Sequence, residues 1–206
     1  MRNTIFDTSM INNLLYLLSS LFLKVLGWHK AGELPAIPKY VLIGAPHTSN
    51  WDFPITLAYA FAYKIKVFWL GKHTMFRKPF GGFLKWLGGI PIDRSKSLNT
   101  VSQSIQLYDT LDKLIMVVSP EGTRKKMKHW KTGFYHIASG ANVPILLGFL
   151  DFRRKLGGFG PMIIPTGDIG ADMKKIRRFY ETIRGKHHDR MSHVTVIGNT
   201  NHADRE

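Results

Sequence analysis

The sequence predicts an α/β protein with a mostly parallel central sheet, helices on both faces and an apolar helix at the N-terminus. Two patterns predict this fold class. Short apolar runs alternate along the chain with longer stretches whose apolar residues recur every three or four positions. The short runs are typical of buried strands, and strands separated by helices usually pair in parallel. Polar residues follow several of these strands, where α/β folds place their functional sites.

The N-terminal segment, residues 1–34, contains a nearly continuous apolar run over residues 11–28. Its most apolar part, residues 14–26, would form a helix of about 20 Å, which is shorter than the ~30 Å hydrocarbon core of a bilayer. Lys24 near its end also argues against a membrane span. Two interpretations stay open. The helix packs against the rest of the protein, or it associates with a membrane by lying in the bilayer interface.

Residues 35–206 are expected to form one α/β domain with a basic C-terminal helix and, beyond Gly185, a loose tail. Residues 114–118 are the clearest buried strand, and the apolar residues of the segment 98–111 recur at helical spacing. Glycine or proline ends several elements. The expected strands cover residues 40–45, 66–70, 90–93, 114–118, 143–150 and an edge strand at 161–164. The expected helices cover residues 51–63, 79–87, 98–111, 131–141 and 171–183.

The composition favours an anionic partner. The chain has 206 residues, with 29 Lys and Arg against 14 Asp and Glu, a formal net charge of +15 and a pI near 10.1. It has no cysteine, which excludes disulfides, a cysteine nucleophile and thiolate metal sites. Nucleic acid, a phospholipid surface and a phosphorylated substrate would all suit such a charge, and composition alone does not choose among them.

Three polar clusters follow predicted strands, at residues 46–52, 88–94 and 119–124. In the first cluster, His47 and Asp52 are five positions apart. A carboxylate on one imidazole nitrogen would fix the tautomer and leave the other nitrogen as a base. Taken alone, the same two residues would also fit a helix-capping aspartate and an unrelated loop histidine.

Four blocks recur here in the order and spacing of the glycerolipid acyltransferases. The first is His47 followed by four residues and an aspartate, and the second is Gly-x-x-Ile-Asp-Arg, which ends at Arg94. The third is Pro-Glu-Gly-Thr-Arg, which ends at Arg124, and the fourth is Val-Pro-Ile around Pro144. The sequence therefore resembles the lysophosphatidic acid (1-acyl-sn-glycerol-3-phosphate) acyltransferase family over residues 40–150.

The resemblance implies a set of roles. His47 would be the general base that deprotonates an acceptor hydroxyl, with Asp52 orienting it. The arginines would bind the acceptor's phosphate, because the planar guanidinium matches phosphate oxygens. The donor would be a fatty acyl thioester, on coenzyme A or acyl carrier protein, with no acyl-enzyme, cofactor or metal. The implied acceptor-binding residues are Arg94, Glu121, Gly122, Thr123 and Arg124, and Pro144 would lie near the donor.

The expected function is therefore transfer of a fatty acyl chain to a lysophospholipid hydroxyl, with 1-acyl-sn-glycerol-3-phosphate as the favoured acceptor, in phospholipid biosynthesis or remodelling. Two departures from the family pattern, Pro46 and Ser119, leave the acceptor open, as does the basic run after Arg124. A non-catalytic membrane- or polyanion-binding protein of the same fold and a thioester hydrolase are the alternatives.

Motifs typical of metal sites, serine hydrolases and nucleic-acid-binding proteins are missing from the sequence. Nine histidines occur without H-E-x-x-H or compact ligand spacing, so no metal is expected. No G-x-S-x-G or nucleic-acid motif occurs. Basic residues cluster at 124–131 and 174–190. These clusters favour a phospholipid bilayer surface, with peripheral or monotopic association at the cytoplasmic face of the cell membrane. Residues 149–159 could be a lipid-facing loop. Aromatic residues that could wall an acyl channel are Phe53, Phe68, Trp69, Phe76 and Phe80.

Overall fold

The computed structural model of the protein describes residues 3–92, 97–192 and 194. These residues form a seven-stranded sheet, and every neighbouring pair of strands is parallel except β6 with β7. The expected mostly parallel sheet is confirmed. The strands are β1 (His29–Ala31), β2 (Lys39–Ala45), β3 (Val67–Lys72), β4 (Gly89–Ile92), β5 (Leu114–Val118), β6 (Ile145–Asp151) and β7 (Leu156–Ile163), in the spatial order β1-β7-β6-β2-β5-β3-β4.

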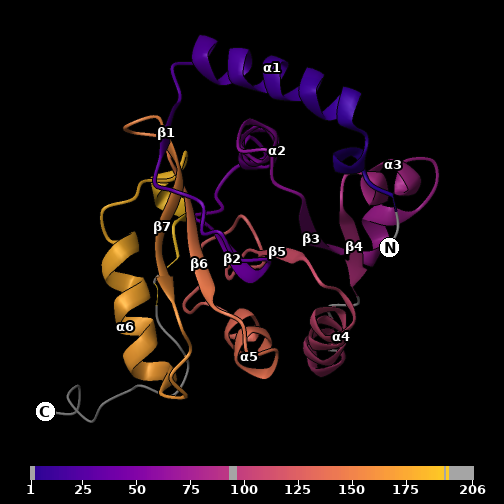
Figure 1. Ribbon diagram of the computed structural model, residues 1–206. Coiled ribbons are helices and arrows are strands. Elements are labelled where there is room, and N and C mark those ends of the chain that lie inside the picture. The colour runs from indigo at the N-terminus through magenta and orange to yellow at the C-terminus, as the bar shows by residue number, and fades with distance from the viewer. Residues whose placement is uncertain (1–2, 93–96, 193, 195–206) are drawn as a thin grey trace, which may run out of the picture.

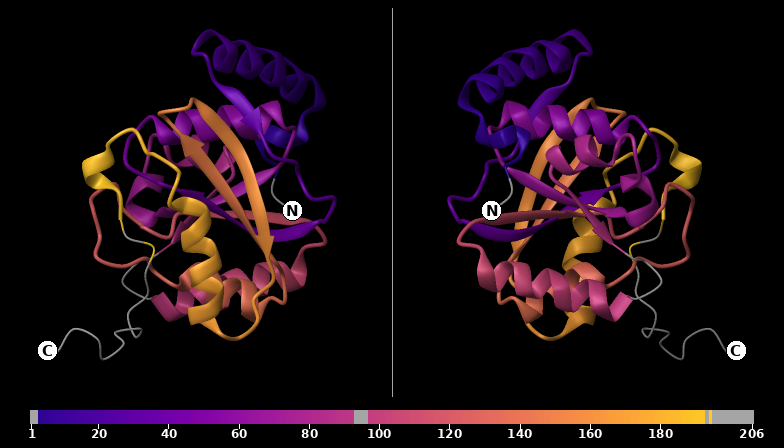
Figure 2. Two further views of the ribbon diagram at one scale, coloured as in Figure 1. Left: turned by 90° about the vertical axis from the view of Figure 1, so that its left-hand side faces the viewer. Right: turned by 90° about the vertical axis from the view of Figure 1, so that its right-hand side faces the viewer.

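Helices cover both faces of the sheet, as the sequence predicts (Figure 1). One face is covered by α2, and α1 lies on α2 as an outer layer (Figures 1 and 2). On the other face, α5 and α6 contribute to one core with the sheet. The helices are α1 (Ser9–Val25), α2 (Asp52–Ala62), α3 (Gly81–Trp86), α4 (Ser97–Thr110), α5 (Gly133–Gly140) and α6 (Ile169–Tyr180), with short 3₁₀ helices at Ile5–Asp7, His73–Phe76 and His188–Arg190.

The central strand β2 is buried on both faces, which explains its nearly continuous apolar sequence. Val41 and Ile43 face the core that α5 and α6 complete, whereas Tyr40 and Leu42 belong to a cluster on the opposite face. This alternation follows from the two-residue period of a strand. Strand β2 lies between β5 and β6, so the residues directly after Ala45 are at the carboxyl edge of the sheet.

The helix α1 has two apolar faces with different surroundings. Leu23 is buried against α2, together with Ile55 and Ala58, so the packing interpretation of this helix is confirmed for one face. None of the helices within the described ranges is long and apolar enough to cross a membrane. The opposite face exposes apolar side chains at helical spacing, namely Met10, Leu14, Leu17, Leu18, Leu21 and Val25.

The sequence reading was wrong about the segment 149–164. Strand β7 is longer than the expected 161–164, and it is no edge strand, because it lies between β6 and β1. Residues 149–159 are not a lipid-facing loop either, since β6 and β7 form an antiparallel hairpin. The glycines at 157, 158 and 160 made this segment look unlike a strand in the sequence, because glycine is depleted in strands. At Gly157 a Cβ would lie 2.3 Å from the Tyr59 ring, so this close approach requires glycine.

Two smaller corrections concern the ends of the fold. Strand β1, which the sequence reading missed, pairs in parallel with β7 and brings the N-terminal segment into the sheet. Residues 185–192 do not form the expected loose tail, because they pack against loops at the carboxyl edge of the sheet. His187 N–H, for example, donates to Thr48 Oγ1 at 3.2 Å.

Candidate active site

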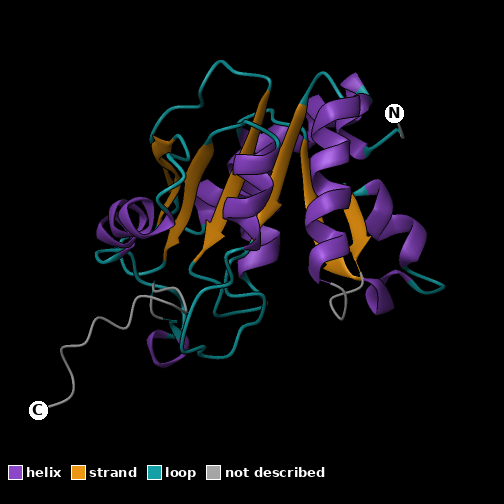
Figure 3. Ribbon diagram, turned by 90° about the horizontal axis from the view of Figure 1, so that it is seen from below, coloured by secondary structure: helices purple, strands orange, loops and turns teal. Residues whose placement is uncertain are grey.

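Two polar loops lie side by side at the carboxyl edge of the sheet. Strands β2 and β5 are parallel neighbours, with Ile43 opposite Val118, so the loops that begin at residues 46 and 119 leave the sheet together. Figure 3 shows strand arrows ending at one edge, where long loops gather. This is the edge at which α/β proteins place ligands and reacting groups.

His47 and Asp52 meet within the first of these loops. His47 Nδ1 lies 3.1 Å from Asp52 Oδ2, as the family resemblance implies. Asp52 begins α2, and the same Oδ2 accepts hydrogen bonds from the backbone N–H groups of Thr48 (2.7 Å) and Ser49 (2.8 Å). The carboxylate therefore folds the loop back on itself and holds one imidazole nitrogen. The other nitrogen, Nε2, is left for chemistry.

Glu121 supports this loop from the neighbouring strand end. Its Oε2 accepts a hydrogen bond from the backbone N–H of His47 at 2.6 Å, and its side chain is 1% exposed. Burial raises the pKa of Glu121 to about 7, although hydrogen bonds from the backbone of His47 and Ser192 oppose the shift. The carboxyl group thus faces the backbone beside His47. The acceptor-binding role that the resemblance implies for Glu121 stays a prediction.

The rest of the Glu121 loop turns outward. Gly122 donates its N–H to the Ser119 carbonyl at 3.1 Å and has a φ of +63°, a conformation that favours glycine. Thr123 Oγ1 accepts a hydrogen bond from Lys125 N–H at 3.3 Å, and Arg124 is exposed. The loop therefore presents the Arg124 cation at the protein surface, three residues after Glu121.

Two residues from the sequence prediction do not join this site. Arg94 lies outside the described residues. Pro144 precedes β6 at the amino end of the sheet, where its carbonyl accepts a hydrogen bond from Val41 N–H at 3.0 Å. His47 follows the opposite end of β2, and the strand from Val41 to Ala45 alone spans about 13 Å. Pro144 therefore does not join His47 at the carboxyl edge of the sheet, and its expected place near the acyl donor stays a prediction.

An apolar cavity of about 190 Å³ opens beside the histidine. His47 and Asp52 form part of its wall, and Phe53 packs edge-on against Trp69 with ring centroids 5.1 Å apart. The remaining wall comes mainly from apolar residues of β2, α2, β3, β6 and β7. The cavity thus places an imidazole at the wall of a mainly apolar space.

Of the five aromatic residues expected to wall a channel, Phe53 and Trp69 line this cavity. Phe76 stacks on Trp69 from behind, with ring centroids 5.6 Å apart. Phe68 packs against the core on the other face of the sheet, and Phe80 is exposed. The sequence reading missed Phe149 and Phe159, which line the cavity from β6 and β7, because the hairpin that presents them was taken for a loop.

Within the described ranges, no three histidine, aspartate or glutamate side chains gather in a way that could hold a metal ion. The pair that does meet here, the His47 imidazole and the Asp52 carboxylate, is suited to proton transfer. An imidazole held by a carboxylate can accept a proton from a hydroxyl group whose oxygen attacks a carbonyl.

Comparisons with known proteins relate this arrangement to an enzyme family. Residues 28–146, more than half of the chain, match a family model described as Acyltransferase. The 1-acyl-sn-glycerol-3-phosphate acyltransferase of Haemophilus influenzae is 34% identical over 117 residues, which are 53% of this chain and 47% of that protein. The enzyme of the same name from Streptococcus pneumoniae is 28% identical over 120 residues, 58% of this chain and 44% of that protein. The chain thus spans about half the length of these relatives.

A solved structure shows the same fold. The crystal structure of the 1-acyl-sn-glycerophosphate (LPA) acyltransferase PlsC from Thermotoga maritima superposes with a TM-score of 0.53. The match covers 81% of this chain and 75% of that one, at 15% sequence identity.

Proposed function

The chain belongs to the acyltransferase family, and from that premise we propose that it moves a fatty acyl group from an acyl thioester to the free hydroxyl of a lysophospholipid. We take 1-acyl-sn-glycerol-3-phosphate as the favoured acceptor, because the two curated relatives are named for it. The donor would be acyl-CoA or an acyl carrier protein thioester, with no other cofactor. The observation that carries the proposal is the contact between His47 and Asp52 at the wall of an apolar cavity.

In this mechanism, His47 Nε2 removes the proton of the acceptor hydroxyl while the hydroxyl oxygen attacks the thioester carbonyl carbon. The tetrahedral intermediate collapses by breaking the carbon–sulfur bond, and the imidazolium returns its proton to the leaving thiolate. Asp52 stabilises the imidazolium and keeps Nε2 directed outward. Such a base contributes about 10²–10⁴ to the rate.

The surroundings supply binding energy for both ends of the lipid. The apolar cavity would hold hydrocarbon next to His47, because burying each CH₂ contributes about 0.8 kcal/mol. Arg124 at the surface would bind the acceptor's phosphate with the help of Gly122 and Thr123, and Arg94 would add a second guanidinium. Glu121 would act through the His47 backbone. Pro144 receives no role in this proposal.

The test measures thiol release from an acyl thioester, with and without lysophosphatidate, together with formation of the diacyl product. Wild type should release thiol only with acceptor, and His47→Ala should lose at least 10² of the rate. His136→Ala, an exposed histidine on α5, is the matched control and should keep full activity. Thiol release that does not depend on the acceptor would indicate a hydrolase. No release with any lysolipid would favour the non-catalytic alternative.

We further propose that the protein binds a phospholipid surface peripherally or monotopically through α1, at the cytoplasmic face of the cell membrane. Leu17 is 62% exposed within a stripe of apolar side chains along one face of this helix, and the other face is packed on α2. A stripe of this kind can bury itself in the interface of a bilayer. The high positive charge would add about 1 kcal/mol for each basic residue near an anionic surface.

Leu17→Asp should weaken sedimentation of the protein with phosphatidylglycerol vesicles by about tenfold or more, because it puts a charge into the apolar stripe. Ser20→Asp adds the same charge on the flank of α1 and is the matched control, with a much smaller effect expected. Salt should slow the initial, charge-driven encounter of wild type with the vesicles, but much of the binding should persist because it depends on the apolar stripe. Equal losses for both variants would show that charge alone matters and would contradict the role of the stripe.

A further inference from the structure

The segment after α6 crosses both loops of the candidate site. We name residues 184–192 the C-terminal strap. His187 N–H donates to Thr48 Oγ1 at 3.2 Å, and Lys186 Nζ lies 5.0 Å from the centre of the Trp51 ring. Further along, Ser192 Oγ accepts a hydrogen bond from Met127 N–H at 3.0 Å. The first part of the strap thus contacts the loop that contains His47, and its last residue contacts the loop that contains Glu121.

Two residues that the strap contacts, Thr48 and Glu121, belong to the hydrogen-bond network around His47. Thr48 is completely buried, and its N–H donates to Asp52 Oδ2 at 2.7 Å. Glu121 accepts hydrogen bonds from the backbone of both His47 and Ser192. A displacement of the strap would therefore reach the imidazole by two routes, through Thr48 and Asp52 and through Glu121.

The strap is closely fitted at its first contact. A Cβ at Gly185 would lie 2.8 Å from Thr48 Oγ1 and 3.1 Å from Pro46 Cγ, which is so close that either the strap or the Thr48 side chain must move. Before this point the chain is held separately, since Ile183 is buried in the core and the Arg184 carbonyl accepts a hydrogen bond from Phe152 N–H at 2.8 Å. The core packing of this region therefore does not depend on the contacts of residues 185–192.

We propose that the C-terminal strap is a positioning element of the active site, which holds the His47–Asp52 pair in reactive geometry. It acts from outside the region that matches the family model, which ends at residue 146. The inference rests on the proposed acyl transfer. Small displacements of a catalytic group are costly, because a shift of 1 Å can lower a rate about 10²-fold. The loss should fall on kcat, since the strap does not line the cavity.

The direct test is Gly185→Ala, which pushes the strap away from Thr48 without removing any group of the site. The control is Gly82→Ala on α3, where an added Cβ meets nothing within 4 Å. We expect Gly185→Ala to lower kcat about tenfold, with the donor KM within twofold of wild type and the melting temperature little changed. Ser192→Ala should lower kcat by a smaller factor, and Ser192→Thr should restore it. An unchanged kcat in Gly185→Ala would overturn the proposal and leave the proposed function standing.

A second measurement is independent of turnover. The imidazole NMR signals of His47, assigned with His47→Ala, should move in Gly185→Ala and stay in place in Gly82→Ala. Unmoved signals would overturn the proposal whatever the activity. A wild-type protein that transfers no acyl group would refute the proposed function. It would overturn the strap's catalytic role as well, even if the His47 signals moved.

Discussion

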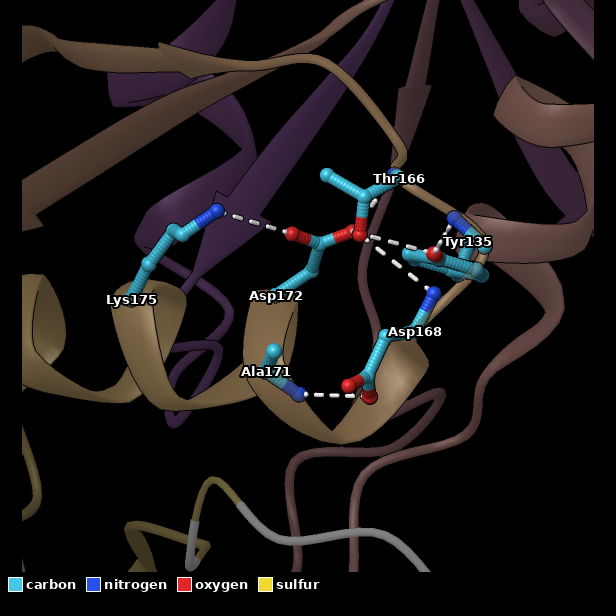
Figure 4. A network of polar contacts seen from close by, with 7 residues as sticks. Tyr135, Thr166, Asp168, Ala171, Asp172 and Lys175 are labelled. Atoms are coloured by element: carbon cyan, nitrogen blue, oxygen red, sulfur yellow. Dashed lines mark hydrogen bonds and ion pairs between the residues drawn. The ribbon is translucent and has the colours of Figure 1, made fainter.

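Two buried aspartates, Asp52 in α2 and Asp172 in α6, use their carboxylates in different ways. Their side chains are 4% and 0% exposed, and each lies in the first turn of its helix. Asp172 uses both oxygens. Its Oδ2 accepts hydrogen bonds from Tyr135 Oη and from the backbone and hydroxyl of Thr166, and Lys175 Nζ lies 3.1 Å from Oδ1 (Figure 4).

Asp52 concentrates its contacts on one oxygen. Oδ2 receives the N–H groups of Thr48 and Ser49 and faces His47 Nδ1, whereas Oδ1 accepts no hydrogen bond from any residue within the described ranges. A carboxylate with both oxygens engaged, as in Asp172, stabilises a fold, since buried polar groups are normally satisfied. A buried carboxylate oxygen left unsatisfied is an exception that calls for an explanation, and its place beside an imidazole and a cavity fits the proposed role of Asp52 in proton transfer. The comparison therefore contrasts a carboxylate whose two oxygens are both bonded within the fold with one that the proposed mechanism uses.

The largest expected effect is that of Asp52→Asn on catalysis. The amide oxygen can still accept the two loop N–H groups, so the stability should change little, but the imidazolium loses its counter-charge. We expect kcat for acyl transfer to fall by about 10²–10⁴. Asp112→Asn, in the turn before β5, is the control. If Asp52→Asn unfolded the protein and left the rate per folded molecule intact, the contrast between the two aspartates would be lost.

Asp172→Asn should show the opposite behaviour. Its amide nitrogen must face a donor, either Lys175 or the cluster at Thr166 and Tyr135, so the network loses contacts that it cannot replace. We expect a loss of roughly 2–4 kcal/mol in the free energy of unfolding, measured with urea, and an unchanged kcat. Asp168→Asn is the matched control, because Asp168 caps α6 through Ala171 N–H and asparagine caps equally well (Figure 4). A kcat that falls with Asp172→Asn would break the distinction.

The pH dependence of stability sharpens the comparison at a third carboxyl group. Burial raises the pKa of Glu121 from 4.5 to about 7, so the folded protein keeps a proton that the unfolded chain has lost. Its contribution is fully present below pH 4.5 and disappears as the pH rises through 7. Burial also acts to raise the pKa of Asp172, but hydrogen bonds from Thr166, Lys175 and Tyr135 outweigh it and hold the pKa below 3.8. That contribution is present above pH 3.8 and is lost as the pH falls through the lowered pKa.

Glu121→Gln should therefore remove a decline in stability between pH 5 and pH 8 that wild type shows. The decline is expected to be about 1–3 kcal/mol, the smallest of the three effects. Urea unfolding of both proteins at the two pH values measures it, and the difference between them cancels the histidines that titrate in the same range. Parallel pH profiles for wild type and variant would contradict the buried, protonated state of Glu121.

The sequence by itself determined the features that depend on neighbouring residues. The strand at 114–118 has the predicted bounds, since a short unbroken apolar run between turns is typical of a buried strand and fits few other structures. The pairing of His47 with Asp52 could also be predicted, because the chain has to reverse over only five residues and the family motif contains both of them. The alternation of strands and helices then implied which loops would share one edge of the sheet.

Only the tertiary structure decided the features that join distant parts of the chain. In the fold, Glu121 points inward and Pro144 lies at the amino end of the strands. Strand β7 forms from a glycine-rich stretch, and His187 contacts Thr48, which lies 139 positions earlier in the chain. The physical reason is that residue type sets local backbone preference, whereas the packing of the whole sheet and its helices selects which distant groups come within hydrogen-bond reach. The candidate site depends on both kinds of information: its His47–Asp52 pair was predicted from the sequence, whereas the contacts from Glu121 and residues 184–192 appear only in the fold.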